Sequence, residues 1–145
     1  MKKLCLIALM VILAISAKSQ EHLGKSLIDI NQYISGNDGY VETRYTKDGI
    51  KFLFCTFSLK RIDATDIGEI AFYLDDSDSC YMYITHFQNQ KALDGLVTLT
   101  KLTPGYFKIE NKFAWTNPDR RFDMEIKIDD DNSGFMLIYT KNKSQ

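Results

Sequence analysis

The sequence contains little proline, histidine, tryptophan or cysteine: its 145 residues include 2 Pro, 2 His, 1 Trp and 3 Cys. So few histidines and cysteines leave little material for a zinc site, which draws its ligands mainly from these residues. With 8 Gly and 2 Pro, the chain is neither a flexible low-complexity chain nor a collagen-like one. The formal net charge is only -1, whereas a nucleic-acid-binding domain carries a strong basic excess. These shortages exclude several classes of protein and select no activity.

Residues able to carry catalysis are also scarce. His86 is the only histidine inside the expected fold, and neither a Gly-x-Ser-x-Gly elbow nor a His-Glu-x-x-His motif occurs. Cys80 would share a strand face with His86, but six strand residues span about 20 Å, so the two side chains cannot meet. The sequence therefore predicts no catalytic residue, no metal ligand and no cofactor, and a protein that is not an enzyme. A small hydrolase built on His86 stays open as an alternative.

One acidic turn partly resembles a cation site. Asp129, Asp131, Ser133 and Gly134 follow the opening pattern of a calcium loop, D-x-D-x-S-G. The match ends there, because Thr140 stands at the twelfth position, where a calcium loop needs a bidentate Glu. The sequence therefore favours a solvated hairpin turn at this point.

The long hydrophobic run of the chain stands near its N-terminus. Leu4–Ile15 holds twelve apolar residues behind two lysines, and small residues follow it. This is the pattern of a secretory signal peptide, and the run is too short for a membrane anchor, which needs about 20 residues. We expect a signal peptide over residues 1–19 and a single domain over residues 20–145. Cleavage after Ala17 is the alternative to cleavage after Ser19.

The expected signal peptide also indicates the compartment in which the protein acts. Cys5 stands at the start of the apolar run, whereas a bacterial lipid-anchor cysteine would stand at its end, so we expect no lipoprotein. The prediction is a protein of the periplasm or the extracellular space. Loss of the leader removes three lysines and leaves 15 basic and 19 acidic residues, a net charge of -4 over about 125 residues. That charge disfavours nucleic acid and anionic membrane surfaces as partners. We also expect no membrane insertion once the leader is removed.

Two helices and about seven strands follow from the hydrophobic pattern. Residues 21–35 carry apolar side chains at helical spacing. Residues 88–102 repeat leucine every three residues and predict a second helix, although 97–100 has strand-type composition. The expected strands cover residues 40–46, 50–58, 69–74, 80–87, 106–115, 121–129 and 135–140.

These elements predict an α+β fold in which two helices pack on one face of a mostly antiparallel sheet. The order is α-β-β-β-β-α-β-β-β, and short connections favour antiparallel neighbours. Each helix leads into a Gly-Tyr-apolar triplet, at residues 39–41 and at residues 105–107. Chance similarity of two turns explains this echo, and a duplicated unit of one helix plus strands is the alternative.

Cys55 and Cys80 remain after the leader is removed, and both fall inside expected strands. In an oxidising compartment they are a candidate disulfide. The alternative is two buried thiols that act as small hydrophobic side chains. In a simple meander a third strand would separate them, whereas a disulfide requires Cα atoms within about 7 Å.

Aromatic residues are the most suggestive feature of the sequence. In the strand 80–87 one face carries Tyr81 and Tyr83, and one face of that strand must pack under a helix. The other face can then offer rings to a sugar or to a protein partner. Trp115 precedes a turn with Arg120 and Arg121, a combination common at interfaces. These five residues are the predicted binding residues, and the alternative is that the rings belong to the core.

Several segments resemble a family of small exported proteins of unknown function from Bacteroidetes-like bacteria. The resemblance lies in the leader end Ala-Lys-Ser-Gln and in the stretches 84–93, 106–109, 113–115 and 122–128. It covers about half of the mature chain and implies an exported α+β fold. It carries no catalytic residues.

We therefore expect an exported, non-catalytic α+β protein that binds another exported or envelope protein, as periplasmic inhibitors and immunity proteins do. The second hypothesis is a protein that binds a small ligand or glycan through Tyr81, Tyr83 and Trp115. The third hypothesis is a small hydrolase.

Overall fold

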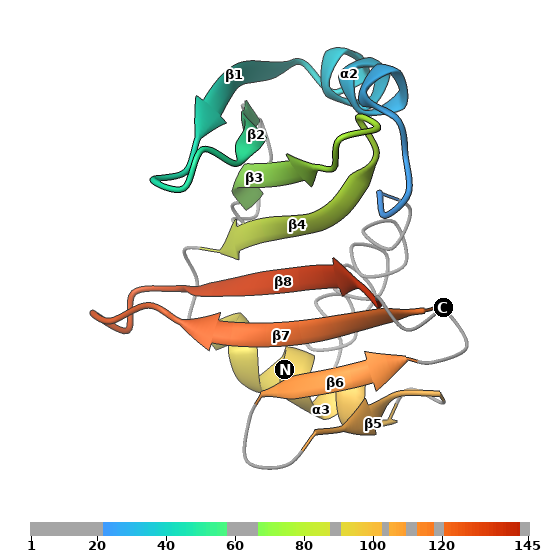
Figure 1. Ribbon diagram of the computed structural model, residues 1–145. Coiled ribbons are helices and arrows are strands. Elements are labelled where there is room, and N and C mark those ends of the chain that lie inside the picture. The colour runs from blue at the N-terminus through green and yellow to red at the C-terminus, as the bar shows by residue number, and fades with distance from the viewer. Residues whose placement is uncertain are drawn as a thin grey trace.

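The computed structural model describes residues 22–57, 67–87, 91–102, 105–109, 113–117 and 121–142. This part of the chain forms two helices and eight strands, which confirms the α+β fold (Figure 1). The elements in chain order are α2 (Leu27–Gly36), β1 (Gly39–Tyr45), β2 (Lys51–Phe57), β3 (Ile67–Leu74), β4 (Cys80–Phe87), α3 (Lys91–Leu102), β5 (Phe107–Lys108), β6 (Ala114–Asn117), β7 (Phe122–Ile128) and β8 (Phe135–Lys141).

All strands join one sheet in the order β1-β2-β3-β4-β8-β7-β6-β5, and each adjacent pair is antiparallel (Figure 1). The first four strands form one meander and the last four another, and β4 and β8 meet at the centre. Each helix precedes one meander, so the two halves share the same element order. This arrangement is what a duplicated helix-plus-strands unit would produce.

The predicted strand count was wrong over residues 106–115, which were expected to form one strand. The chain instead forms β5 and β6, which pair with each other as an antiparallel ribbon. A single strand would place Phe107 and Trp115 on one face, yet Trp115 is buried whereas Phe107 is 60% exposed. A two-residue strand followed by a reversal cannot be distinguished from a single strand by alternation alone, since both present apolar residues at short spacing.

Helix α2 begins at a capping box and ends before a tight turn. The Ser26 hydroxyl accepts a hydrogen bond from the Asp29 backbone N–H, and the Asp29 carboxylate accepts one from the Ser26 N–H. Gly39 then starts β1 where a Cβ atom would come within 2.8 Å of the Ile34 and Phe57 side chains. The chain can turn from helix to strand this tightly only with glycine at that position.

The segment before α2 is tied to the start of β4. The Gly24 N–H donates to the Cys80 carbonyl at 2.7 Å, and the Cys80 N–H donates to the Lys25 carbonyl at 2.9 Å. His22 is buried in an aromatic cage of Tyr33, Phe72 and Tyr83, with ring centroids 4.4 to 5.4 Å away. The predicted helix over 21–35 is therefore confirmed from residue 27. Residues 22–26 are not helical and instead connect α2 to the start of β4 through backbone hydrogen bonds.

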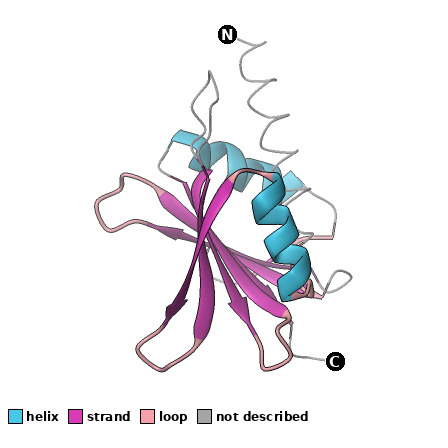
Figure 2. Cartoon of the chain, turned by 90° about the horizontal axis from the view of Figure 1, so that it is seen from above, coloured by secondary structure: helices cyan, strands magenta, loops and turns pink. Residues whose placement is uncertain are grey.

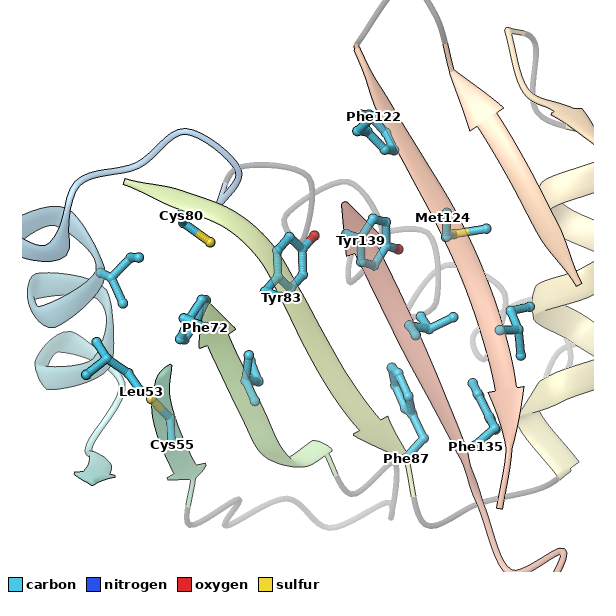
Figure 3. Close-up of a cluster of buried hydrophobic side chains, with 14 of the residues drawn as sticks. Leu53, Cys55, Phe72, Cys80, Tyr83, Phe87, Phe122, Met124, Phe135 and Tyr139 are labelled. Carbon is cyan, nitrogen blue, oxygen red and sulfur yellow. The ribbon is translucent and has the colours of Figure 1, made fainter. Parts of the chain in front are cut away.

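The hydrophobic core lies between the sheet and both helices, which stand along one side of the fanned strands (Figure 2). Figure 3 shows buried side chains from successive strands on this face, with α2 at one end and α3 at the other. At the central seam Tyr83 stacks on Tyr139 with ring centroids 4.8 Å apart, and Phe87 stacks on Phe135 at 4.9 Å. These pairs join the two meanders into one core. Among the described residues, no helix has the length and apolar character needed to cross a membrane.

Candidate functional site

One face of the sheet carries both helices, and the opposite face carries neither helix. Along β2, Leu53 and Cys55 point into the core, while Phe52 and Phe54 alternate to the other side and are half-buried. We call this other side the helix-free face. We take it as the candidate functional site, because it carries large apolar side chains and no helix among the described residues covers it.

An apolar row crosses the centre of the helix-free face. Strand register places Phe54 beside Ala71, Ala71 beside Ile84, and Ile84 beside Ile138. All four side chains are half-buried. At the two ends of this row, Glu42 on β1 pairs with Phe54 and Glu125 on β7 pairs with Ile138. We call these four apolar residues the central row.

Aromatic rings lie beside the central row. The Phe52 and Tyr73 rings stack with centroids 5.0 Å apart, and the Tyr81 ring packs edge-on to Tyr73 at 6.5 Å. All three side chains are half-buried. Burial raises the pKa of the Tyr73 phenol, and the neighbouring Tyr81 raises that pKa further. These three rings pack against one another, and we call them the aromatic cluster.

A charged pair borders this surface on β1. The Arg44 Nη2 lies 2.8 Å from Glu42 Oε2, and the Arg44 guanidinium lies 3.9 Å above the Phe54 ring centroid. A guanidinium over an aromatic face is attracted by the ring's quadrupole. Arg44 therefore connects the charged border of the helix-free face to its central row.

At the other end of the strands His86 lies between two carboxylates. Its Nε2 is 2.8 Å from Asp129 Oδ2, and its Nδ1 is 3.4 Å from Glu69 Oε2. The hydrogen bond with Asp129 raises the pKa of His86, desolvation opposes the rise, and the Asp129 charge and Glu69 add to it. The arrangement favours the imidazolium form. Because both ring nitrogens face a carboxylate, neither is available to take a proton from a nucleophile.

Neither buried thiol serves as a nucleophile. Burial raises the pKa of both Cys55 and Cys80 to about 12, so both stay protonated at neutral pH. Both are free. Cys55 pairs with Ile70 and Cys80 pairs with Leu74, so the two cysteines lie two strands apart and about 13 Å apart along β3. The candidate disulfide therefore does not form, and the thiols belong to the core.

The predicted binding residues are dispersed. Tyr83 is 0% exposed and Trp115 is 1% exposed, so both belong to the core. Tyr81 lies on the helix-free face, Arg121 is an exposed turn residue with a φ of 57°, and Arg120 lies outside the described residues. Among these residues only Tyr81 contributes to the candidate site.

Tyr81 and Tyr83 were expected on one face, and that expectation was wrong. The register between β3 and β4 shifts where Tyr73 pairs with Met82 and Leu74 pairs with Cys80, which leaves Tyr81 as the additional residue of a bulge. The bulge interrupts the alternation, so Cys80 and Tyr83 both face the core. Strict period-two reasoning cannot detect such an insertion.

Sequence reasoning missed Phe52, Tyr73 and the central row as surface residues. The signal available was the apolar character of both faces of the strand 50–58, a pattern typical of a strand that is buried on both sides. The structure covers one face of that strand with α2 and leaves its other face on the helix-free side.

The turn after β7 is a hairpin turn, as predicted. The Asp129 N–H donates to the Gly134 carbonyl at 3.1 Å, and Asp131 Oδ1 accepts from the Ser133 N–H and hydroxyl. Within the described ranges no group of three or more His, Cys, Asp or Glu side chains is placed to hold a metal ion. No family model, curated protein or solved structure matches the chain.

Proposed function

We propose that this is an exported, non-catalytic binding protein whose helix-free face docks another protein of the cell envelope or exterior. The observation that carries the proposal is the central row with its aromatic cluster on a face that neither helix covers. Apolar side chains at the centre of a patch and charges at its border are the anatomy of a protein–protein interface.

The aromatic cluster supplies the expected energetic centre. Binding energy concentrates in a few well-packed, large side chains, with tyrosine prominent among them. Phe52, Tyr73 and Tyr81 already pack against one another, so little conformational entropy is lost when a partner covers them. The charged residues at the border, such as Arg44 and Glu125, then set orientation and association rate.

Export supports the choice of partner. The apolar segment Leu4–Ile15 behind two lysines has the features of a signal peptide, so the docking face would work in the periplasm or outside the cell. An exported domain without a catalytic constellation can act by occlusion, as inhibitors and immunity proteins do. The family resemblance in the leader and in the stretches 84–93 and 122–128 agrees with that compartment.

The alternative hypothesis of a glycan-binding protein has less support than protein binding. It used three rings, of which Tyr83 and Trp115 are buried in the core. Tyr81 and Tyr73 are half-buried by each other rather than set around a concave site. A sugar would therefore meet the edge of a packed cluster, which favours a broad protein surface over a saccharide as the occupant.

Matched isoleucine substitutions test the proposal. Ile84→Arg places a charge in the central row, whereas Ile28→Arg changes an isoleucine that is 69% exposed on α2. We expect Ile84→Arg to weaken capture of the envelope partner by at least about tenfold, because it places a charge in the apolar centre of the interface. Ile28→Arg should leave capture unchanged. Circular dichroism would confirm that both variants fold, and a photo-crosslinker at Ile138 would report contact directly.

Equal capture by the two variants would place the interface elsewhere on the molecule. If a crosslinker at Ile138 captures no envelope protein while one at Ile28 does, the helix-free face is likewise not the docking surface.

A further inference from the structure

Strand β1 forms an outer edge of the sheet, and its outer side pairs with no strand in the described part of the chain. All seven of its residues pair with β2 in unbroken register. Soluble proteins protect such edges with proline, bulges or charged side chains. β1 has no proline and no bulge, and its two charged side chains, Glu42 and Arg44, pair with each other. Tyr40 and Tyr45 are 65% and 66% exposed. A regular, uncovered edge strand is a template for another strand.

Hydrogen-bond alternation identifies which groups of β1 are turned outward. The Thr46 N–H donates to the Ile50 carbonyl at 2.9 Å, so Thr46 turns its backbone groups toward β2. In an antiparallel pair these groups alternate in direction from residue to residue. The backbone N–H and C=O groups of Val41, Thr43 and Tyr45 therefore point away from β2, along the open edge.

The side chains on the two sides of Thr43 carry opposite charges. Glu42 precedes Thr43 and Arg44 follows it, while Val41 and Tyr45 supply an apolar residue on each side. When the strand meets an antiparallel copy of itself centred on Thr43, each acidic residue faces a basic residue of the other copy, so the strand is self-complementary in charge. Such a contact is isologous and closes with twofold symmetry.

We propose that two copies of this protein pair through their β1 edges, antiparallel, about a twofold axis at Thr43. Thr43 then lies opposite Thr43 of the other copy, and Val41 lies opposite Tyr45. These are the residues with outward backbone groups, so each of their N–H and C=O groups finds a partner. The two eight-stranded sheets become one continuous sheet.

The same register pairs the charges. Glu42 of each copy lies opposite Arg44 of the other, in the closer type of antiparallel pair, whose Cα atoms are about 4.5 Å apart. Within one chain Glu42 and Arg44 already lie 2.8 Å apart, so the dimer assembles four charges of alternating sign. Opposite charges at directly facing positions stabilise a strand pair.

Charge also excludes the neighbouring registers. A shift of two residues in one direction places Glu42 opposite Glu42, and a shift in the other direction places Arg44 opposite Arg44. A shift of one residue instead sets the outward groups of one copy against groups that the other copy has turned toward its own β2. The register centred on Thr43 is therefore the one that satisfies both the backbone and the charges.

This inference does not depend on the proposed function. The β1 contact is carried by the outward backbone groups of the edge, whereas the docking proposal is carried by the central row. The two share only the border charges Glu42 and Arg44, and Thr43→Pro tests the dimer without changing either charge, so each proposal can fail alone. In the dimer the helix-free faces of both copies lie on the same side, because the twofold axis runs perpendicular to the continuous sheet.

The test is the oligomeric state of the protein, purified from cells that express the full chain and measured by analytical ultracentrifugation. The wild type should show a concentration-dependent monomer–dimer equilibrium at submillimolar concentration. Arg44→Glu and Glu42→Arg each place like charges opposite one another, so each should raise the dimer Kd by about tenfold or more. The matched control Lys127→Glu, an exposed charge on β7 away from the edge, should leave the Kd unchanged.

Mixing the two single variants supplies the decisive readout. Arg44→Glu has two acidic residues at the edge and Glu42→Arg has two basic ones, so an equimolar mixture should form a heterodimer although each variant alone is monomeric. The double variant E42R/R44E should dimerise as the wild type does, because its charges still face opposite charges.

A backbone variant covers the case in which the charge variants unfold. Thr43→Pro removes an outward N–H, which β1 does not use toward β2, and should abolish the dimer while circular dichroism remains native. A monomeric wild type at submillimolar concentration would overturn the proposal. So would a dimer that survives Arg44→Glu and Thr43→Pro, or an edge that pairs only with a strand of a different protein.

Discussion

At the scale of single residues, close packing and local charge decide what each side chain can do. Gly134 begins the return from the β7–β8 turn, and a Cβ atom there would lie 2.1 Å from the Phe87 carbonyl oxygen and 2.8 Å from Asp129 Oδ2. The same turn positions Asp129 to hold His86. Glycine at this position therefore allows both the close approach of two strands and the placement of the carboxylate.

Gly134→Ala should destabilise the protein by about 2 kcal/mol or more, because the added methyl group meets backbone that cannot move without breaking the sheet. Gly36→Ala is the matched control. No atom lies within 4 Å of its Cβ position, and it ends a helix, so its effect should be neutral or stabilising by about 0.5 kcal/mol. Urea denaturation of both variants provides the comparison, and an equal loss of stability would contradict this account.

His86 should make stability depend on pH. Because the hydrogen bond with Asp129 raises the pKa of His86 in the folded state, its stabilisation is complete below the ordinary histidine pKa of 6.5. It is lost as the pH rises through the raised value. Glu69 from β3 and Asp129 and Asp131 from the turn act on the imidazolium, while Met136 on β8 is an uncharged neighbour.

We therefore expect His86→Gln to cost about 1 kcal/mol near pH 6 and less near pH 9, since a hydrogen bond to a charged group is worth about that much at a partly exposed site. Lys127→Gln, an exposed neighbour, should show no such dependence. Urea denaturation at the two pH values measures both effects. A loss that is larger at the higher pH would reverse the assigned sign.

At the scale of elements, local signals and tertiary register have separate roles. The capping box at Ser26 and the buried pair Ile30 and Ile34 explain where α2 begins and which side it buries. The register shift in β4 follows from no local signal, yet it decides that Tyr81 belongs to the helix-free face. The strand 106–115 was misassigned for the same reason, because the reversal between β5 and β6 depends on pairing with β7.

Ser26→Ala should destabilise the protein by about 1 kcal/mol, because it removes the side chain that accepts from the Asp29 N–H. Ser35→Ala, at an exposed position in the same helix, is the matched control and should change stability little. Thermal unfolding followed by far-ultraviolet circular dichroism would measure both. A similar loss in the two variants would show that the cap does not contribute.

At the scale of the whole molecule, two similar halves share one core. The seam between β4 and β8 carries the stacked pairs Tyr83–Tyr139 and Phe87–Phe135, and both helices contribute to the same cluster. Neither meander can bury these rings alone. The halves should therefore unfold together, although the element order of each half is complete.

Two intrinsic probes test this cooperativity. Trp115, the single tryptophan, is buried in the second half, and Cys55 and Cys80 are buried thiols in the first half. Tryptophan fluorescence and thiol labelling should give coincident urea midpoints. Labelling that begins at lower urea than the fluorescence change would show that the first half opens separately.

The sequence by itself determined the fold class, both helices and the positions of most strands, because helical and strand periodicities follow directly from which side chains must leave water. It also indicated which residues are apolar. The tertiary structure alone decided which apolar residues remain at the surface. The placement of both helices on one face, the bulge at Tyr81 and the meeting of β4 with β8 depend on contacts between distant segments, which no local pattern encodes.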